Sequence, residues 1–107
     1  MEDEREVEFT AAMLEIYKRA KDECGYNAKV YLAMVTELGA LETARRLLHA
    51  STVSDGYTTL WEARRLDLTV EAVALQPEWS DLFTDEEKTI ARRRLEEYGY
   101  LDGESAR

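Results

Sequence analysis

Apolar side chains recur at three- and four-residue steps along most of the chain, which is the spacing of one face of an α-helix. The first such stretch covers residues 7–24, and its apolar stripe consists of Phe9, Met13, Ile16, Tyr17, Ala20 and Cys24. Gly25 follows this stripe directly, and glycine suits the left-handed residue that ends many helices. The pattern therefore predicts a first amphipathic helix that stops at Gly25.

Two shorter helices are predicted next, separated by Gly39. Asn27 suits the N-cap of the first of them, and Tyr26 and Tyr31 are spaced to close over it as a hydrophobic staple. Its inner face is expected to consist of Tyr31, Met34, Val35 and Leu38. The other helix is expected from Leu41 to His49, with the inner face Leu41, Ala44, Leu47 and Leu48.

The strongest loop signal inside the chain is a run of small and hydroxyl residues over positions 50–56. Ser54 or Asp55 is expected to cap a helix that follows this loop and runs from Gly56 to about Arg65. The residues of this helix that we expect to face inward are Tyr57, Leu60 and Trp61.

Residues 66–70 alternate between apolar and polar side chains, as in a β-strand. No other segment alternates in this way, so a lone strand would leave its backbone groups without partners. We therefore expect a helix that begins with Thr69 as its N-cap and with Leu68 packed on Val73. It must end near Gln76, because a residue that precedes proline avoids the α-helical conformation.

Pro77 suits the first position of a short helical turn, in which Trp79, Leu82 and Phe83 are the apolar residues. The sequence from Thr84 to Glu87 then fits a capping box, with three acidic residues at the positive end of the helix dipole. The last helix is expected to turn Ile90, Ala91, Leu95 and Tyr98 inward and to end at Gly99.

These elements together predict an all-α, compact single-domain bundle of about five helices and one short helical turn. The domain is expected to cover residues 7–100, with an acidic N-terminal tail over 1–6 and a frayed C-terminal tail over 101–107. Apolar residues make up 45% of the 107 residues. We expect this to suffice for one core but not for a core and a large ligand cavity.

The charge is strongly negative: 23 acidic and 14 basic residues give a formal net charge of −9. Such a surface repels phosphate, so nucleic acid is an improbable partner. No apolar run is long enough to span a membrane, and the acidic start is unlike a signal peptide. Cys24 is the single cysteine, which excludes an internal disulfide and favours the reducing cytoplasm.

The run from Leu60 to Ala72, followed by Pro77-Glu78-Trp79 and Leu82-Phe83-Thr84, resembles a segment of small uncharacterised bacterial all-helical proteins. Residues 25–27 and 44–48 look similar to the upstream part of the same group, so the likeness covers roughly residues 12–100. The resemblance implies a helical fold and a bacterial origin. It implies no activity and no site residues, because the group has no established activity.

Catalytic signatures are missing from the sequence, so we expect a protein that is not an enzyme and that binds no metal or cofactor. His49 is the single histidine, and its position favours a cation at the end of a helix. Cys24 lies on an apolar stripe, which favours a core position over a nucleophile. One group of carboxylates is dense enough to consider for acid–base chemistry, although salt bridges to arginine explain it more simply: Glu62, Asp67, Glu71, Glu78 and Asp81.

The absence of catalytic spacing leads to our first functional hypothesis, a small cytoplasmic adaptor domain that presents a helical face to another protein or to a second copy of itself. Its candidate contact is a groove walled by Tyr57, Trp61 and Trp79, with Arg64 and Arg65 at the rim. Against this groove stands the expectation that both tryptophans belong to the core.

The alternative hypothesis is an accessory or inhibitor protein of a bacterial DNA-modification or defence system. It would act as an acidic mimic of DNA, or through weak nucleic-acid contacts of Arg92, Arg93 and Arg94. The resemblance adds to this alternative, because similar segments accompany DNA-modification and defence proteins.

Overall fold

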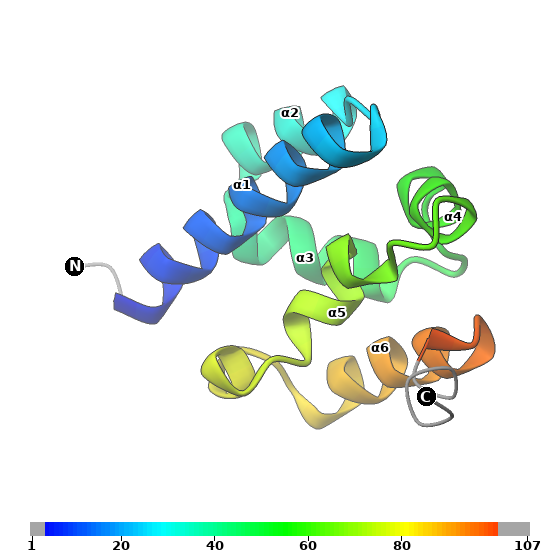
Figure 1. Cartoon of the computed structure of the whole chain (residues 1–107). Helices are drawn as coiled ribbons and strands as arrows, with labels where there is room; N and C mark the ends of the chain where they lie inside the picture. Colours follow the sequence, from blue (N-terminus) through cyan, green and yellow to red (C-terminus); the bar gives the residue numbers. More distant parts are fainter. Residues whose placement is uncertain (1–3, 101–107) are drawn as a thin grey trace.

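The computed structural model describes residues 4–100, and this part of the chain is all-α with no strand. Six α-helices and two 3₁₀-helices follow one another in it (Figure 1). Their bounds are α1 Glu4–Cys24, α2 Lys29–Leu38, α3 Ala40–His49, α4 Asp55–Glu62, η1 Leu66–Leu68, α5 Val70–Ala74, η2 Pro77–Leu82 and α6 Asp85–Glu97. The fold class is confirmed, while the number of short elements is larger than expected.

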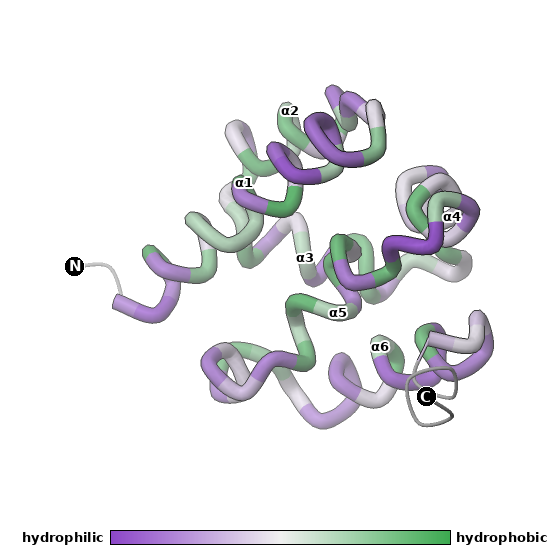
Figure 2. The backbone as a smooth tube through the Cα atoms, viewed as in Figure 1, coloured by the Kyte–Doolittle hydropathy of each residue, from purple (hydrophilic) through white to green (hydrophobic). Residues whose placement is uncertain are grey.

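Helix α3 lies at the centre of the arrangement, because it packs against α1, α2, α5 and α6. Helices α1 and α2 lie together on one side of it, and α6 lies on the other (Figure 1). The hydrophobic residues of α5 fill the middle of the fold, between α1 and α6 (Figure 2). Helix α4 packs chiefly on η1, at the edge of the bundle.

Two apolar clusters form the core, and aromatic rings organise both. In the larger cluster the ring of Phe9 meets Trp79 and Phe83 edge to face, with ring centroids 5.7 and 5.5 Å apart. Trp79 is only 7% exposed, so its expected place in the core is confirmed. The smaller cluster consists of Tyr57, Leu66 and Leu95 with partly buried neighbours.

Three side-chain caps predicted from the sequence are present. Ser54 Oγ accepts a hydrogen bond from the Tyr57 amide at the start of α4, and Thr69 Oγ1 accepts one from the Ala72 amide at the start of α5. At α6 the capping box is complete, with Thr84 Oγ1 bound by the Glu87 amide at 3.1 Å and Glu87 Oε1 bound by the Thr84 amide at 2.9 Å. These caps define the helix starts because each satisfies an amide that no helical carbonyl can reach.

The start of α2 differs from the prediction. Its N-cap is Ala28, with no side-chain cap, because Asn27 Oδ1 instead accepts a hydrogen bond of 2.7 Å from the Tyr17 hydroxyl. The Tyr31 hydroxyl donates to the Met13 carbonyl at 2.8 Å, so this ring is positioned by α1. Contacts between helices replace the local cap.

The N-terminal boundary of the helical domain differs from the prediction. Residues 4–6 belong to α1, which begins at Glu4, so the acidic tail predicted over 1–6 is too long. Acidic side chains in the first turn of a helix face the positive end of its dipole, which favours this extension. The tail predicted over 101–107 lies outside the described residues.

Helix α4 ends three residues earlier than expected, at Glu62. Arg64 then has a φ of +63°, the Arg65 amide donates to the Leu60 carbonyl at 2.8 Å, and the Arg64 amide donates to the Trp61 carbonyl at 2.9 Å. This pair of bonds is a Schellman motif, in which glycine is the usual left-handed residue. An arginine in this conformation carries a steric cost that glycine does not.

A buried ion pair connects the middle of the fold. Arg94 of α6 is 8% exposed, and its Nη1 donates to Glu71 Oε2 of α5 at 2.8 Å. The same guanidinium donates to the Leu47 carbonyl at 3.0 Å and to the Ala50 carbonyl at 2.6 Å, both at the C-terminal end of α3. Burial raises the pKa of the Glu71 carboxyl above its ordinary value, against the hydrogen bond from Arg94. A single guanidinium thus joins α3, α5 and α6.

Arg64→Gly is expected to stabilise the protein by about 0.5–1 kcal/mol, because glycine adopts the left-handed conformation without a Cβ clash. This value is a net gain, since glycine also increases the conformational entropy of the unfolded chain. Urea unfolding measures the change. Arg93→Gly in the exposed middle of α6 is the control and should destabilise by about 1 kcal/mol. Equal signs for the two substitutions would contradict the assignment.

Glu71→Ala is expected to lower the free energy of unfolding by about 3–5 kcal/mol, because it leaves the Arg94 charge buried without its partner. The double substitution Glu71→Leu with Arg94→Met should cost less than the sum of the single substitutions, measured in a double-mutant cycle. Arg93→Ala, on the exposed neighbour, should stay within about 0.5 kcal/mol of the wild type. Additive single effects would show that the two side chains do not interact.

Candidate functional site

Of the three aromatic residues predicted to wall the contact groove, Trp61 is the one that the structure places at the surface. It projects from the C-terminal end of α4 and is 44% exposed, so the expectation that it lies in the core is wrong. The ring of Tyr98 meets Trp61 edge to face at 5.3 Å, and Tyr98 in turn meets Tyr57 at 5.0 Å. The Tyr57 hydroxyl donates to the Arg94 carbonyl at 3.0 Å, which anchors this row of rings to α6. Trp61 is therefore exposed and held in a defined position.

The predicted groove walled by Tyr57, Trp61 and Trp79 does not form. Tyr57 is buried in the smaller core cluster, whereas Trp79 lies in the larger one against Phe9. The indole Nε1 of Trp79 donates to Gln76 Oε1 at 3.1 Å. The two tryptophans belong to different parts of the fold because η2 carries Trp79 to α1, while α4 carries Trp61 to the end of α6.

The two arginines predicted at the rim have different roles. Arg64 is exposed next to Trp61 and forms no ion pair with the described residues. Arg65 Nε and Nη2 donate hydrogen bonds to the two carboxylate oxygens of Asp67, each at 3.0 Å. Arg65 Nη1 donates to Glu23 Oε1 at 2.6 Å, and this bond connects the end of α4 to α1. The hydrogen bonds from Arg19 and Arg65 lower the pKa of Glu23. Arg65 is engaged within the protein, as the simpler salt-bridge interpretation predicts, and Arg64 is the arginine left available.

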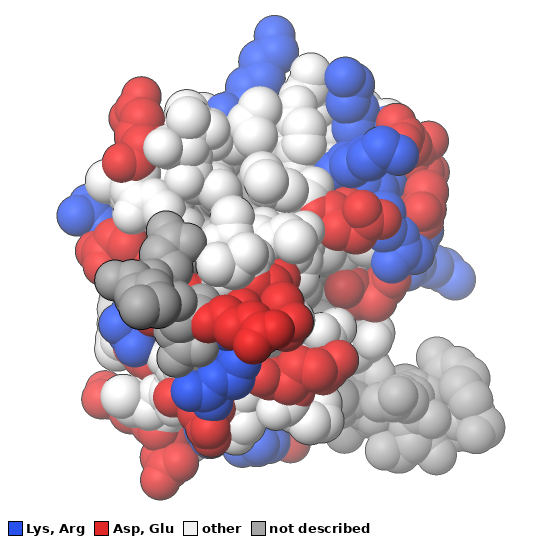
Figure 3. Space-filling model, turned by 90° about the vertical axis from the view of Figure 1, so that its left-hand side faces the viewer, with Lys and Arg blue, Asp and Glu red and all other residues white. Residues whose placement is uncertain are grey.

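Arg92, Arg93 and Arg94 do not form one basic surface. Arg92 and Arg93 are exposed on α6, but the Arg94 side chain is buried on the ion pair with Glu71. On the face seen in Figure 3, the basic side chains that gather along one edge lie beside acidic ones. Direct nucleic-acid contact through all three arginines is therefore contradicted. Acidic mimicry of DNA rests on the net charge alone and stays a prediction.

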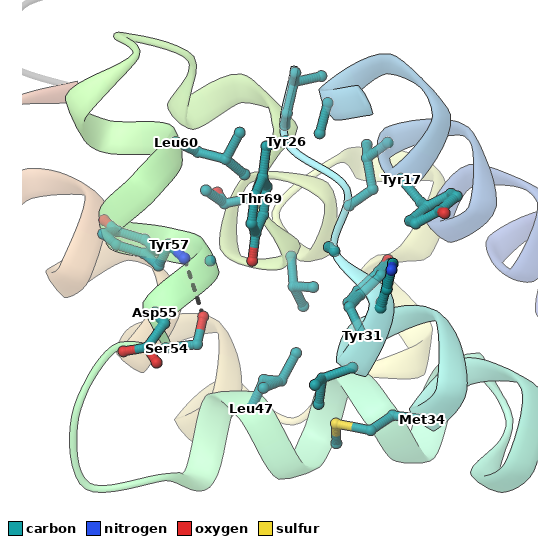
Figure 4. A pocket seen from close by; sticks show the side chains of 18 of the residues that line it. Tyr17, Tyr26, Tyr31, Met34, Leu47, Ser54, Asp55, Tyr57, Leu60 and Thr69 are labelled. Carbon is teal, nitrogen blue, oxygen red and sulfur yellow. Dashed lines mark hydrogen bonds between the residues drawn. The ribbon is translucent and has the colours of Figure 1, made fainter. Parts of the chain in front are cut away.

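A cavity of about 430 Å³ lies between α1, the start of α2, α4 and α5. Figure 4 shows Tyr26 reaching into it, between Leu60 of α4 on one side and Tyr17 and Tyr31 on the other. The expectation that the apolar residues leave no large cavity is wrong. Composition measures how much apolar surface is available, but it does not show whether two short helices meet along their whole length.

The acidic groups considered for catalysis serve mostly as ion-pair partners. Asp67 binds Arg65, Glu71 binds Arg94, and Asp81 binds Arg5. No cluster of three or more potential metal ligands occurs in the described part of the chain. Cys24 is partly buried and packs against the larger core cluster.

His49 closes α3 and contacts the capping box of α6. Its Nε2 lies 2.9 Å from Glu87 Oε2, and Arg45 Nε lies 3.6 Å from the same oxygen. Burial alone would raise the pKa of Glu87, but the Thr84 amide, His49 and Arg45 outweigh it and hold that pKa below its ordinary value. The predicted position of His49 in the last helical turn is confirmed, and its partner is a structural carboxylate.

No family model, curated protein or solved structure matches this chain. Within residues 4–100, every helix is too short or too polar to cross a lipid bilayer.

Glu87→Gln is expected to weaken the dependence of the free energy of unfolding on pH in the acidic range. Because the folded-state pKa of Glu87 is lowered, its charge stabilises the fold above the ordinary pKa of 4.5, and this contribution disappears as the pH falls through the folded value. Gln retains an oxygen for the Thr84 amide, so the substitution removes the charge and keeps the cap.

Urea unfolding between about pH 7 and about pH 3 measures this effect, with an expected loss of about 1 kcal/mol at the upper end and convergence with the wild type at the lower end. Glu86→Gln on the exposed neighbouring position is the control and should follow the wild-type curve. An unchanged wild-type slope in Glu87→Gln would contradict the role of this charge.

Proposed function

We propose that this chain is a cytoplasmic protein-interaction domain that acts by binding rather than by catalysis, with Trp61 as the centre of its contact surface. The observation that carries the proposal is the exposed indole held by Tyr98. Tryptophan, tyrosine and arginine are enriched among the residues that dominate protein interfaces. The two aromatic residues bury a large area at low entropic cost, and arginine donates several hydrogen bonds to a carboxylate. Trp61, Tyr98 and Arg64 bring these three residue types together.

The rigidity of Trp61 supports this function further. The row of rings from Trp61 to Tyr57 is anchored by the hydrogen bond to the Arg94 carbonyl. A preorganised side chain loses little conformational freedom when a partner covers it, so more of its burial becomes binding free energy. The expected partner surface offers an apolar pocket for the indole and a carboxylate for the unpaired Arg64 guanidinium.

Trp61→Ala is expected to weaken partner binding by about 2 kcal/mol or more, and Arg64→Glu should weaken it through charge repulsion. Quantitative mass spectrometry of proteins captured by wild type and variants identifies the partner, and titration of the purified partner then gives the Kd values. Leu38→Ala is the matched control, because Leu38 is a 39% exposed apolar residue on α2. Sedimentation of the chain alone tests whether the partner is a second copy.

Thermal unfolding of each variant separates loss of binding from loss of fold. The proposal fails if Trp61→Ala and Leu38→Ala bind the partner equally well. Salt dependence tests the alternative function: an acidic DNA mimic would bind a basic partner in competition with DNA and would lose affinity steeply as salt rises. An interface centred on Trp61 should respond weakly to salt.

A further inference from the structure

The size of the cavity between α1, α2, α4 and α5 limits what can occupy it. Its volume is about 430 Å³, within the range of small-molecule sites. Two turns of an α-helix with side chains occupy roughly 850 Å³, taking a cylinder about 10 Å wide and about 11 Å long. The cavity therefore cannot enclose a partner helix, whereas its volume suits a small molecule.

The walls of the cavity are mainly apolar. The non-aromatic apolar part of the lining consists of Ile16, Ala20, Ala28, Val30, Met34, Leu47, Leu60, Leu68 and Val70. Tyrosine rings from α1, α2 and the turn before α2 complete the lining, as seen in Figure 4. This composition favours an apolar ligand body, because burial of apolar surface is the main source of affinity in such a site.

Most hydroxyl groups of the lining are already hydrogen-bonded within the protein. The Tyr31 hydroxyl donates to the Met13 carbonyl, the Tyr57 hydroxyl to the Arg94 carbonyl and the Tyr17 hydroxyl to Asn27 Oδ1. Burial raises the pKa of Tyr31 and that of Tyr57, so both stay neutral hydrogen-bond donors. These groups are committed to the fold and offer a ligand little beyond their apolar ring faces.

Tyr26 is the exception among the hydroxyls that line the cavity. Its ring is half-buried and reaches into the cavity, and no described residue forms a hydrogen bond with its hydroxyl. Gly56 of α4 lies opposite: a Cβ at that position would approach the Tyr26 oxygen to 3.1 Å, so the missing side chain leaves this hydroxyl room. A hydroxyl that faces the cavity and is not used by the protein is available for a hydrogen bond to a ligand.

The charges around the cavity balance. Lys29 and Asp55 line it with opposite signs and are exposed, and Glu71 is compensated by Arg94. A charged ligand therefore finds no uncompensated partner inside, and it would lose its hydration on entry. The net charge of −9 further disfavours an anion.

We propose that this cavity binds a small uncharged apolar molecule, with an aliphatic or aromatic body against the helix faces and one hydrogen-bonding group at the Tyr26 hydroxyl. This site is separate from the Trp61 surface, because Trp61 does not line the cavity. Val30 lines the cavity and is 76% exposed, so we place the entrance for the ligand beside this side chain.

N-phenyl-1-naphthylamine, an uncharged fluorescent probe with a single N–H group, tests the site in a fluorescence titration of the full chain. We expect saturable binding with one equivalent of probe. Val30→Trp should weaken it at least tenfold by obstructing the mouth. Tyr26→Phe should weaken it about fivefold, the value of one neutral hydrogen bond, without a loss of thermal stability.

Val7→Trp is the matched control, since it adds the same side chain at an exposed position of α1 outside the cavity. It and Trp61→Ala should leave the titration unchanged. Absence of saturation, equal effects of Val30→Trp and Val7→Trp, or loss of binding in Trp61→Ala would overturn the proposal. The last result would place the probe on the exposed indole.

Displacement of the probe by 1-decanol and by decanoate tests the class of ligand. The two molecules share their chain length and differ in the charge of the polar group. We expect decanol to displace the probe at a concentration at least tenfold lower. Stronger displacement by decanoate would overturn the proposed preference for an uncharged ligand.

Discussion

The hydrogen bonds of the Arg94 guanidinium hold the two sides of this small bundle together. One nitrogen binds Glu71 of α5 and the Leu47 carbonyl, and the other binds the Ala50 carbonyl just after α3. The last carbonyls of a helix have no partner within it and carry its negative dipole end, so a cation at this place satisfies both needs. Because burying a charge alone is costly, Arg94 and Glu71 are each tolerated in the core only through the other.

The position of α4 depends on this centre. The Tyr57 hydroxyl binds the Arg94 carbonyl, so the side chain of Arg94 fixes α6 to α3 while its backbone fixes α4 to α6. At its other end α4 is closed by the left-handed Arg64 and tied to α1 by Arg65. An eight-residue helix is unstable by itself, so these attachments, rather than its own helix propensity, place its side chains.

Local signals in the sequence predict the helix starts, since Thr69 and Thr84 cap amides only three residues away. They fail where a partner is distant: Asn27 binds a tyrosine ten residues away instead of capping α2, and Arg94 finds its carboxylate at a separation of 23 residues. Periodicity placed Trp61 wrongly in the core, and the charge of Arg94 led to a wrong placement of its side chain at the surface. Periodicity identifies residues that can share a helix face, but the neighbour that covers this face depends on how the helices pack.

Helix α4 has more apolar surface than the fold covers, and this explains why both candidate surfaces involve it. Leu60 turns towards the cavity, while Trp61, one residue further along the helix, is rotated by about 100° towards Tyr98. Because α4 packs chiefly on the short η1, neither side is closed by a long neighbouring helix. The helix attached to the Arg94 carbonyl therefore borders a cavity on one side and carries an exposed indole on the other.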